Sequence, residues 1–575
     1  MVALHEPIDE AIRRELSEYD DLTAALLSRR GITSRLEAAA FITPSYDEHV
    51  GDPLLILNMP KAAKRISDAI TAGERITVWS DYDCDGIPGG TMFHDFLKKA
   101  GANFDNYIPH RHEEGFGVNV LGVEKLARAG TKVLITIDCG ITDVEAITRA
   151  KELGIDCMVT DHHLPADVLP PAFAIIDPKQ EGETNTFREF CGAGLAWKLA
   201  CATLVVGRKE NASWVKDIPL GWEKWLLDMA GLATIADMVP LVGENRVIAK
   251  YGLLVMRKSP RLGLQALCRV ARVNQRFITE DDVGFMLAPR VNAASRMGDP
   301  RDAFLLFTTE SESEANRLAG ELEKANRSRK AQAAAITRAA HERLAEKKLH
   351  GPLPSVIAIG DPDWRPGLLG LVANTLAEEY ERPVFLWGRE GGHSLKGSCR
   401  AGGVCSVVDL MENASELFEG YGGHKASGGF TVKDDAVFSL EERLTQIFDG
   451  LPKVEDALAA RADAVLTASE ATNELLTRLS RLAPFGMHNE RPVFAFLNVG
   501  LTKVSWFGKS EEHLKIAISS DGFDGIEGVS FFAKRELGPS IKTLTEGKRV
   551  SVLASLERDQ FTKGRPVRLR LVAVS

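Results

Sequence analysis

Three short β-rich runs in the first half of the chain each end in an aspartate. RITVWS precedes Asp81, KVLITI precedes Asp138 and CMVT precedes Asp161. Helical patterns separate the runs, which predicts a largely parallel sheet with helices on both faces. Because open parallel sheets bind ligands beyond the carboxyl ends of their strands, we expect the three acids to converge although they lie far apart in sequence.

The first of these acids opens DYDCDG, which holds three aspartates spaced two residues apart. Like charges this close repel one another unless a cation lies among them. A calcium-binding EF-hand loop also begins D-x-D-x-D-G, but it needs a preceding helix and a glutamate at position twelve, where this chain has Met92. If the backbone is extended, Asp81, Asp83 and Asp85 project to one side and Cys84 to the other.

Two histidines and one more acid complete the set of candidate ligands. His162 and His163 follow Asp161 directly, and Asp237 ends the apolar segment ATIA. Carboxylates with imidazole suit Mn²⁺ or Mg²⁺, and the absence of thiolates argues against structural zinc. The set suits a two-metal centre that hydrolyses a phosphate ester, with one histidine as ligand and the other facing the substrate. Its members are Asp81, Asp83, Asp85, Asp138, Asp161, His162, His163 and Asp237.

The length of 575 residues predicts several domains. A helical region follows the first α/β segment and contains one long charged helix pattern, a second α/β segment begins at PSVIAIG, and β-rich runs after residue 490 predict a small barrel. We therefore expect an α/β multidomain protein. Its parts are a helical extension (1–60), a parallel-sheet domain (61–255), a helical connector (256–350), a second α/β domain (351–450) and an OB-like barrel (451–575).

Composition and charge limit the partners of the chain. No apolar run approaches the roughly 20 residues of a membrane helix and the N-terminus has no apolar signal core, so we expect a cytoplasmic protein with no membrane partner. The eight cysteines form no CxxC pair and are expected to be reduced. A net charge of −10 gives no general attraction for nucleic acid, which would need a local basic groove.

Two further segments carry candidate phosphate contacts. GYGGHKASGG contains five glycines, which allow close approach of a ligand, beside His424 and Lys425; a plain glycine turn is the alternative. APRVNAASRMG contains Arg290, Asn292 and Arg296, although arginines at a helix start are more often structural. Both segments stay open between a functional and a structural role.

The barrel region carries aromatic residues and a slight excess of positive charge. Residues 451–575 contain 18 Lys and Arg against 15 Asp and Glu. Such a barrel suits a single nucleic-acid strand, which it holds by stacking and phosphate contacts. We expect Trp506 on the surface for stacking, and Phe531 and Phe532 inside the barrel.

Six motifs occur in the order typical of one superfamily: DYDCDG, TIDCG, VTDHH, ADMVPL, APRVNAASRMG and GGHKASGG. In them the chain resembles the DHH phosphoesterase superfamily. With the C-terminal barrel it is similar to the RecJ family of single-strand-specific 5′-to-3′ DNA exonucleases. The resemblance covers essentially the whole chain after residue 50.

The resemblance implies a role for each candidate. Asp138 would bridge two Mn²⁺ or Mg²⁺ ions, His163 would lie beside the scissile phosphate, and Asp161 would orient a histidine. Which aspartate binds which ion stays open. The implied metal ligands are Asp81, Asp83, Asp85, Asp138, His162 and Asp237, and the centre of the chemistry is Asp138, His162 and His163. The candidate DNA contacts are Arg290, Asn292, Arg296, Arg365, Arg400, Gly422, Gly423, His424, Lys425 and Trp506.

Two positions depart from the family pattern. Arg365 stands where a histidine is usual, and Pro88 stands where a small hydroxyl residue is usual. An arginine still suits a phosphate contact, whereas any role that requires an imidazole is in doubt. Neither position belongs to the implied metal ligands.

The leading hypothesis is a metal-dependent exonuclease that degrades single-stranded DNA from its 5′ end, releasing mononucleotides in recombination and repair. One alternative is a phosphodiesterase for short oligoribonucleotides or cyclic dinucleotides, which the barrel disfavours. The other is a non-catalytic replication scaffold, which would be expected to have lost metal ligands. We expect a monomer with single-stranded DNA as its partner, and a helicase and a single-strand-binding protein as candidate partners.

Overall fold

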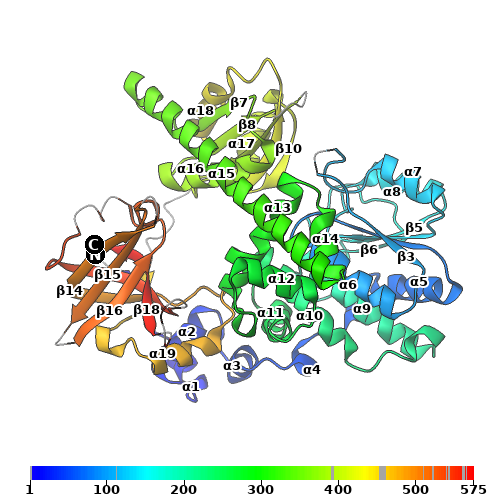
Figure 1. Cartoon of the computed structure of the whole chain (residues 1–575), viewed down its shortest axis with the longest axis horizontal. Helices are drawn as coiled ribbons and strands as arrows, with labels where there is room; N and C mark the ends of the chain where they lie inside the picture. Colours follow the sequence, from blue (N-terminus) through cyan, green and yellow to red (C-terminus); the bar gives the residue numbers. More distant parts are fainter. Residues whose placement is uncertain are drawn as a thin grey trace. The chain divides into compact units, whose positions relative to one another are not determined.

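The chain divides into two compact units (Figure 1). Unit 1 contains Met1–Ala325 and Ala462–Ser575, and unit 2 contains Asn326–Arg461. The computed structural model describes residues 3–575 except 112, 390–393, 452–460, 509–510, 521–522, 539–540, 542–543, 560–561, 563 and 565.

A five-stranded parallel sheet in unit 1 contains the three aspartate-ended runs, as predicted. Its order is β3 (Phe104–Tyr107), β2 (Ile76–Ser80), β4 (Val133–Ile137), β5 (Asp156–Thr160) and β6 (Ala174–Ile176). Strands β2 and β4 are buried along their whole length, which explains why they read as continuous apolar runs.

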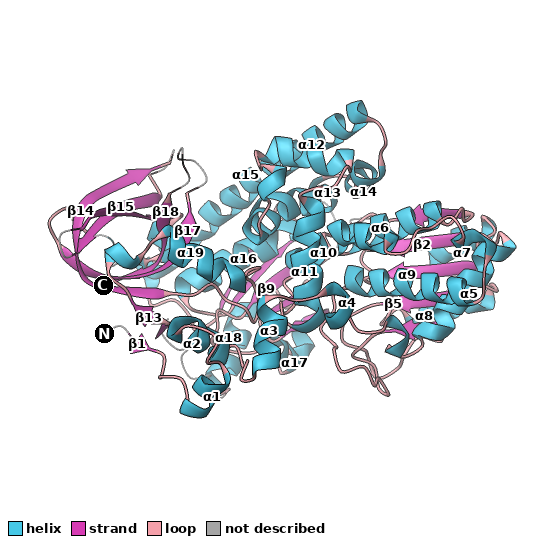
Figure 2. Cartoon of the chain, turned by 90° about the horizontal axis from the view of Figure 1, so that it is seen from below, coloured by secondary structure: helices cyan, strands magenta, loops and turns pink. Residues whose placement is uncertain are grey.

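Helices cover both faces of this sheet (Figure 2). One face packs against α5 (Met59–Ala72), α6 (Gly86–Lys99) and α9 (Gly192–Lys209). The other packs against α7 (Val120–Arg128) and α8 (Val144–Glu152). Alternate strand residues serve the two cores: Val78 faces the first and Trp79 the second.

The helical region after the sheet shares its core. The first core runs from Ile56 to Leu322, so the predicted domain boundary at residue 255 lies within it and stays a prediction. The last helix, α15, is the long charged helix expected from the sequence, and it passes from unit 1 into unit 2. The helices are α10 (Leu227–Ala236), α11 (Gly243–Met256), α12 (Leu262–Ala271), α13 (Ala288–Met297), α14 (Arg301–Thr308) and α15 (Glu312–His350).

Unit 2 has a mixed sheet of its own. The order is β10 (Phe418–His424), β11 (Ser427–Val432), β9 (Leu395–Arg400), β8 (Val384–Gly388) and β7 (Ile357–Asp361), with only β7 and β8 parallel. Helices α16 (Pro366–Tyr380), α17 (Val407–Glu412) and α18 (Leu440–Gly450) accompany it. The glycine segment forms a hairpin, in which Gly422 pairs with Gly429 and Gly423 with Gly428.

A closed five-stranded barrel forms the C-terminal part of unit 1. Its strands are β14 (Phe494–Phe507), β15 (His513–Ser520), β16 (Phe523–Ser530), β17 (Arg549–Arg558) and β18 (Val567–Val574), and pairing of β14 with β17 closes it. This confirms the predicted OB-like architecture. The short elements nearby are β1 (Ala3–Leu4), β12 (Arg461–Ala462), β13 (Ala464–Val465), α19 (Asn473–Leu479) and α20 (Ala533–Glu536).

The N-terminal extension completes the core of the barrel. Helices α1 (Glu10–Glu15), α2 (Asp21–Arg29) and α3 (Arg35–Ile42) precede the short α4 (Tyr46–His49). Leu27 and Phe41 belong to the same buried cluster as Leu475 and Phe494, and Figure 1 shows α1 and α2 beside α19. Residues from the two ends of the sequence therefore form one apolar core.

Buried Arg246 on α11 joins this barrel core to the helical region. Its guanidinium donates hydrogen bonds to the carbonyl oxygens of Phe41 (2.8 Å) and Ala483 (3.1 Å). Burial lowers the pKa of Arg246 to about 9. One side chain thus satisfies carbonyl groups of both the extension and the segment that leads into the barrel.

Shortening Leu27, which is fully buried, tests the shared core. We expect Leu27→Ala to destabilise the barrel by about 2–5 kcal/mol, the usual cost of such a cavity. The measurement is hydrogen exchange, in which amides of β14 and β17 should lose protection while those of β4 keep it. Leu36→Ala is the control, because Leu36 is 84% exposed. Unchanged exchange in the barrel would contradict a shared core.

Candidate metal centre

The carboxyl ends of adjacent strands bring the predicted acids together. Asp81, Asp138 and Asp161 follow β2, β4 and β5, and the strand pairing continues into them: the Asp81 N–H donates to the Ile137 carbonyl (3.1 Å) and the Asp138 N–H to the Thr160 carbonyl (2.9 Å). The register of the sheet therefore fixes the relative positions of these three residues.

The candidate ligands form two neighbouring clusters that a third group overlaps. Asp81, Asp83 and Asp138 make the first, and Asp85, His162 and Asp237 make the second. The overlapping group is Asp138, His162 and His163, and within each group the ligand atoms lie within 4.8 Å of one another. Asp138 Oδ1 also lies 3.2 Å from His162 Nε2, so Asp138 reaches both clusters. All six implied ligands therefore meet in one place.

The DYDCDG segment is a turn and not extended backbone. Backbone N–H groups of Asp85 and Gly86 donate to Asp83 Oδ1, at 2.7 and 3.2 Å. The turn leaves Asp81 and Asp83 in the first cluster and Asp85 in the second, so the extended backbone considered for this segment does not occur, although all three side chains reach the centre. Cys84 is buried in the apolar core and belongs to neither cluster of candidate ligands, as expected.

Helix α9 begins against the centre. The N–H groups of Gly192 and Ala193 donate to Asp85, at 2.6 and 2.8 Å, and a helix N-terminus favours such a negative charge. A Cβ at Gly192 would lie 2.5 Å from the Cβ of Asp138, so only glycine permits this approach. Asp138 itself adopts a left-handed φ of 63°, which costs free energy for a non-glycine residue.

The electrostatics of the centre call for cations. Burial and mutual repulsion hold the pKa values of Asp81, Asp138 and Asp237 well above the usual range, and they raise the pKa of Asp85 to about 6. The Oδ1 atoms of Asp81 and Asp138 are buried without a hydrogen bond. Oxygen and imidazole ligands around such unpaired buried carboxylates fit Mn²⁺ or Mg²⁺.

Asp161 lies behind the clusters and holds His163. Its Oδ1 lies 2.7 Å from His163 Nδ1, and its carboxylate accepts backbone hydrogen bonds from Ile141 and His162. Burial alone would raise the pKa of Asp161, but these bonds lower it below its usual value. Burial alone would lower the pKa of His163, yet the bond to Asp161 raises it.

The candidate DNA contacts on α13 have different environments. Arg290 is 6% exposed, and its Nε lies 2.7 Å from Glu323 on α15. Asn292 Oδ1 accepts a hydrogen bond from the Cys84 N–H (2.8 Å) and so braces the DYDCDG turn. We therefore propose structural roles for Arg290 and Asn292 in place of phosphate contacts. Arg296 is half-buried and acts electrostatically on Tyr82 beside the centre, where a phosphate contact stays a prediction.

The candidates in unit 2 lie within that unit's own sheet. Arg400 ends β9 and Lys425 lies in the β10–β11 turn, and both line one pocket of about 770 Å³. Gly422, Gly423 and His424 are exposed on β10. Arg365 precedes α16 and is half-buried. Their contact with DNA stays a prediction.

The structure adds two residues that the sequence analysis missed. Arg111 lies 4.8 Å over the ring of Tyr82, which follows Asp81 directly. Phe116 is 51% exposed, with its ring 5.7 Å from that of His163. Both belong to the loop after β3, which ends at the same sheet edge as β2. Because β3 is parallel to β2, the sequence could have indicated that the loop after β3 lies at the edge where the acids converge.

The barrel aromatics depart from expectation. Trp506 is half-buried against the barrel core, whereas Phe531 and Phe532 are 38% and 47% exposed. The expectation that these phenylalanines fill the barrel is wrong, because both lie in the turn that follows β16 and not in a barrel strand.

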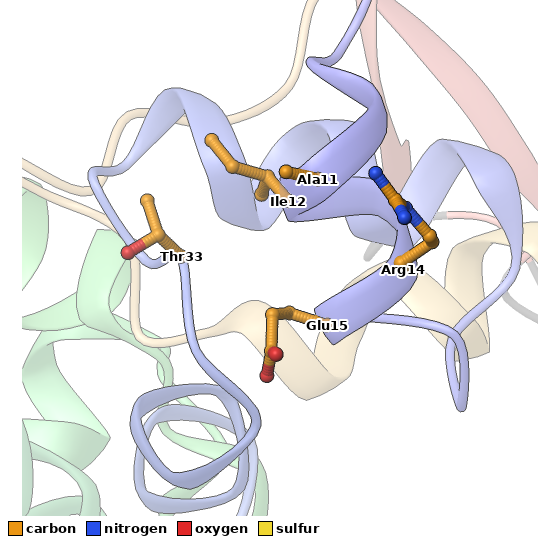
Figure 3. Close-up of a pocket in the computed structure, with 5 residues that line it drawn as sticks. All are labelled: Ala11, Ile12, Arg14, Glu15 and Thr33. Carbon is orange, nitrogen blue, oxygen red and sulfur yellow. The ribbon is translucent and has the colours of Figure 1, made fainter.

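A pocket of about 380 Å³ in the N-terminal extension is separate from this chemistry (Figure 3). It is lined by Ala11, Ile12, Arg14, Glu15 and Thr33. Glu15 is the one carboxylate among these lining residues, and the guanidinium of Arg14 would repel a divalent ion. None of the candidate ligands lines it, so it is not assigned to the site.

Comparison with known families divides the chain as the fold does. Residues 75–229 match the DHH family, N-terminal domain; residues 353–452 match the DHHA1 domain; and residues 462–573 match the RecJ OB domain. The three matches cover the parallel sheet, the sheet of unit 2 and the barrel.

Curated relatives match over most of the chain. The single-stranded-DNA-specific exonuclease RecJ of Bacillus subtilis is 33% identical over 96% of this chain and 67% of its own length. The RecJ of Escherichia coli is 30% identical over 92% of this chain and 93% of its own. The chain belongs to the RecJ family.

Solved RecJ structures agree with this assignment. A Thermus thermophilus RecJ in complex with Mn²⁺ shares the fold, with a TM-score of 0.80 at 24% identity over 100% of this chain and 78% of that one. An exonuclease RecJ bound to manganese matches at 32% identity with a TM-score of 0.58, over 69% of this chain and 96% of that one.

Among the described residues of the chain, none of the helices combines the length and the apolar character needed to span a membrane.

Replacing Asp138 with asparagine tests the metal centre apart from activity. Asparagine tolerates the left-handed backbone at this position and removes one of the repelling carboxylates. We expect the metal-free variant to unfold at a higher temperature than the metal-free wild type. Mn²⁺ at 100 times its dissociation constant should add about 2.7 kcal/mol to the wild type and much less to the variant.

Thermal unfolding with and without Mn²⁺ measures both effects. Asp217→Asn is the control, because Asp217 is an exposed aspartate of the same unit outside both clusters. An equal Mn²⁺-induced shift in Asp138→Asn and wild type would contradict the assignment.

Proposed function

We propose that the protein is a metal-dependent exonuclease that degrades single-stranded DNA from its 5′ end, releases mononucleotides, and acts in DNA recombination and repair. The observation that carries the proposal is the cluster of carboxylates and the neighbouring cluster of carboxylates with His162, linked by Asp138, in a chain of the RecJ family. Related proteins of this family are named single-stranded-DNA-specific exonucleases.

The two clusters suggest how the ligands divide. Asp81 and Asp83 would hold one ion, Asp85, His162 and Asp237 the other, with Asp138 between them. A pair of divalent ions supplies an activated water and stabilises the charge on the displaced phosphoryl oxygen. Backbone N–H groups donate to the carboxylates of Asp83 and Asp85, and these hydrogen bonds would keep the two ligands in position when the substrate binds.

His163 would contact the scissile phosphate. Its Nδ1 is engaged by Asp161, which fixes the ring orientation and leaves Nε2 as the nitrogen available to the substrate. Arg111, held over Tyr82, adds a cation close enough to act electrostatically on Asp81. Its planar fork of donors suits a phosphate oxygen of the bound strand.

Two alternatives receive less support. A phosphodiesterase for very short oligonucleotides needs no strand-binding barrel, and this chain has one. A non-catalytic scaffold has no need of metal ligands, and all six candidates are present with buried, unpaired oxygens among them.

Further features of the proposal concern partners. The barrel supports single-stranded DNA as the polymer that binds. We also propose that the protein works as a monomer in the cytoplasm with a helicase and a single-strand-binding protein, because a single-strand exonuclease needs unwound substrate.

Asp138→Asn also tests the activity. We expect hydrolysis of single-stranded DNA with Mn²⁺ to fall roughly 10³-fold or more, because about 4 kcal/mol of transition-state stabilisation requires intact ligands. Strands labelled at the 5′ or the 3′ end, duplex DNA, short RNA and a linear dinucleotide are compared by electrophoresis. A 5′ label should appear at once as a mononucleotide, and a 3′ label in a shortening ladder.

Asp217→Asn serves again as the control and should match wild type. Equal activity in Asp138→Asn, or release of the 3′ label first, would refute the corresponding part of the proposal.

Arg400→Ala tests the phosphate contacts of unit 2. We expect weaker binding of single-stranded DNA of any sequence. The slope of log affinity against log salt concentration should become less steep by about 1, because one phosphate contact is lost. Fluorescence anisotropy in the presence of a chelator measures both. Arg389→Ala is the control, since Arg389 pairs with Asp434 on the surface of the same unit (2.6 Å). An unchanged slope in Arg400→Ala would show that Arg400 does not contact the DNA backbone.

A further inference from the structure

A fourth strand of the parallel sheet also ends in an aspartate. Asp177 follows β6 directly, and the Asp161 N–H donates to the Ile176 carbonyl (3.1 Å), so Asp177 lies at the same sheet edge as Asp161. Its side chain is fully buried, and among the described residues Oδ2 finds no hydrogen-bond partner. Burying a carboxylate costs free energy unless a hydrogen bond or a cation compensates it, so the surroundings of Asp177 should supply one.

Lys179 supplies both a hydrogen bond and a cation. Asp177 Oδ1 accepts a hydrogen bond from the Lys179 N–H (2.8 Å), which fixes the lysine in a turn. The Lys179 ammonium in turn donates to the carbonyl oxygen of His162 (2.5 Å). One half-buried lysine thus joins the end of β6 to the histidines that follow β5.

The backbone of His162 is therefore held from two sides. Its N–H donates to Asp161 Oδ1 (2.8 Å), and its carbonyl accepts from Lys179. Between these two bonds the side chain places Nε2 3.7 Å from Asp85 Oδ2 and 3.8 Å from Asp237 Oδ2. Loss of the carbonyl bond would free the peptide that orients this ligand of the second cluster.

The charge of Lys179 acts in the opposite direction on metal binding. Burial and the neighbouring acids raise the pKa of Asp237, and the nearby Lys179 ammonium works against them. An ammonium this close to a ligand also repels a divalent cation. The two effects of the lysine thus have opposite signs, which allows an experiment to separate them.

We propose that Lys179 is a positioning residue for the ion of the second cluster. It acts by holding the carbonyl of His162, and Asp177 fixes the turn that presents it. His163 is secured separately, since its N–H and its Nδ1 both lie within hydrogen-bond distance of Asp161 Oδ1. The inference goes beyond the proposed function, because it concerns how firmly one ion is held and not which polymer is cut; it rests on the proposed division of the ligands between two ions.

Mn²⁺ binding to the full-length protein without DNA tests this role. Electron paramagnetic resonance of free Mn²⁺ gives the affinity of each ion. We expect Lys179→Met to weaken one ion roughly 10-fold to 100-fold, the usual effect of losing a group that orients a ligand, and to leave the other unchanged. Removal of the positive charge alone would strengthen binding, so a weaker ion reports the lost contact with the His162 carbonyl.

Two further variants serve as controls. Lys179→Arg keeps a donor and the charge, and it should restore most of the affinity. Lys216→Met should match wild type, because Lys216 is an exposed lysine of the same unit outside both clusters.

A double variant identifies the ion that Lys179 supports. His162→Gln should lose the ion of the second cluster and keep the other. Adding Lys179→Met should then weaken nothing further, because both changes act on one ion. Hydrolysis of single-stranded DNA gives a second readout: excess Mn²⁺ should restore kcat in Lys179→Met but not in His162→Gln, with KM for DNA unchanged in Lys179→Met.

The outcomes separate this inference from the proposed function. Unchanged or tighter Mn²⁺ binding in Lys179→Met would overturn the inference, and so would weakening of the ion that His162→Gln retains. A raised KM for DNA at saturating Mn²⁺ would also overturn it, because Lys179 would then contact the substrate. Mn²⁺ bound by the wild type without degradation of DNA would refute the proposed function alone, whereas a wild type that binds no Mn²⁺ would refute both.

Discussion

The crowding of buried carboxylates at one sheet edge is the constraint on which the rest of unit 1 depends. Asp81 and Asp138 are buried and Asp237 is half-buried beside other acids, and their raised pKa values express the cost of charging them there. Divalent cations remove that cost by replacing repulsion with coordination. The metal centre is therefore unstable as an isolated arrangement of side chains and must be imposed by the surrounding fold.

The fold imposes it from several directions. Strand register fixes Asp81 against Asp138, and the start of α9 donates two N–H groups to Asp85. The close approach of Gly192 and the left-handed backbone of Asp138 both cost free energy or restrict sequence. Such strain persists where surrounding packing over-determines it, and here the buried sheet and its helices provide that packing.

Sequence analysis reached the convergence of the acids because parallel strands place their carboxyl ends together whatever the loops do. It did not reach their division into two clusters, because that depends on hydrogen bonds to Asp83 within a turn. Nor did it reach the burial of Arg290, whose partner Glu323 lies on another helix. The exposure of Phe531 was missed because β16 ends one residue before it, and the sequence did not locate that strand end. The ligand types were predictable, and the partners set by tertiary packing were not.

The metal centre and the barrel both have to accept a strand of any base sequence under the proposed function. In the proposed chemistry the metal ligands and His163 act on a phosphodiester, which is identical at every nucleotide. An enzyme that steps along any sequence gains nothing from reading base edges, because a tight contact with one base would slow release at the next. Aromatic faces and cations accept every base and every phosphate. The metal centre and the arginine over Tyr82 thus fit one proposed strategy, in which only the features common to all nucleotides are bound.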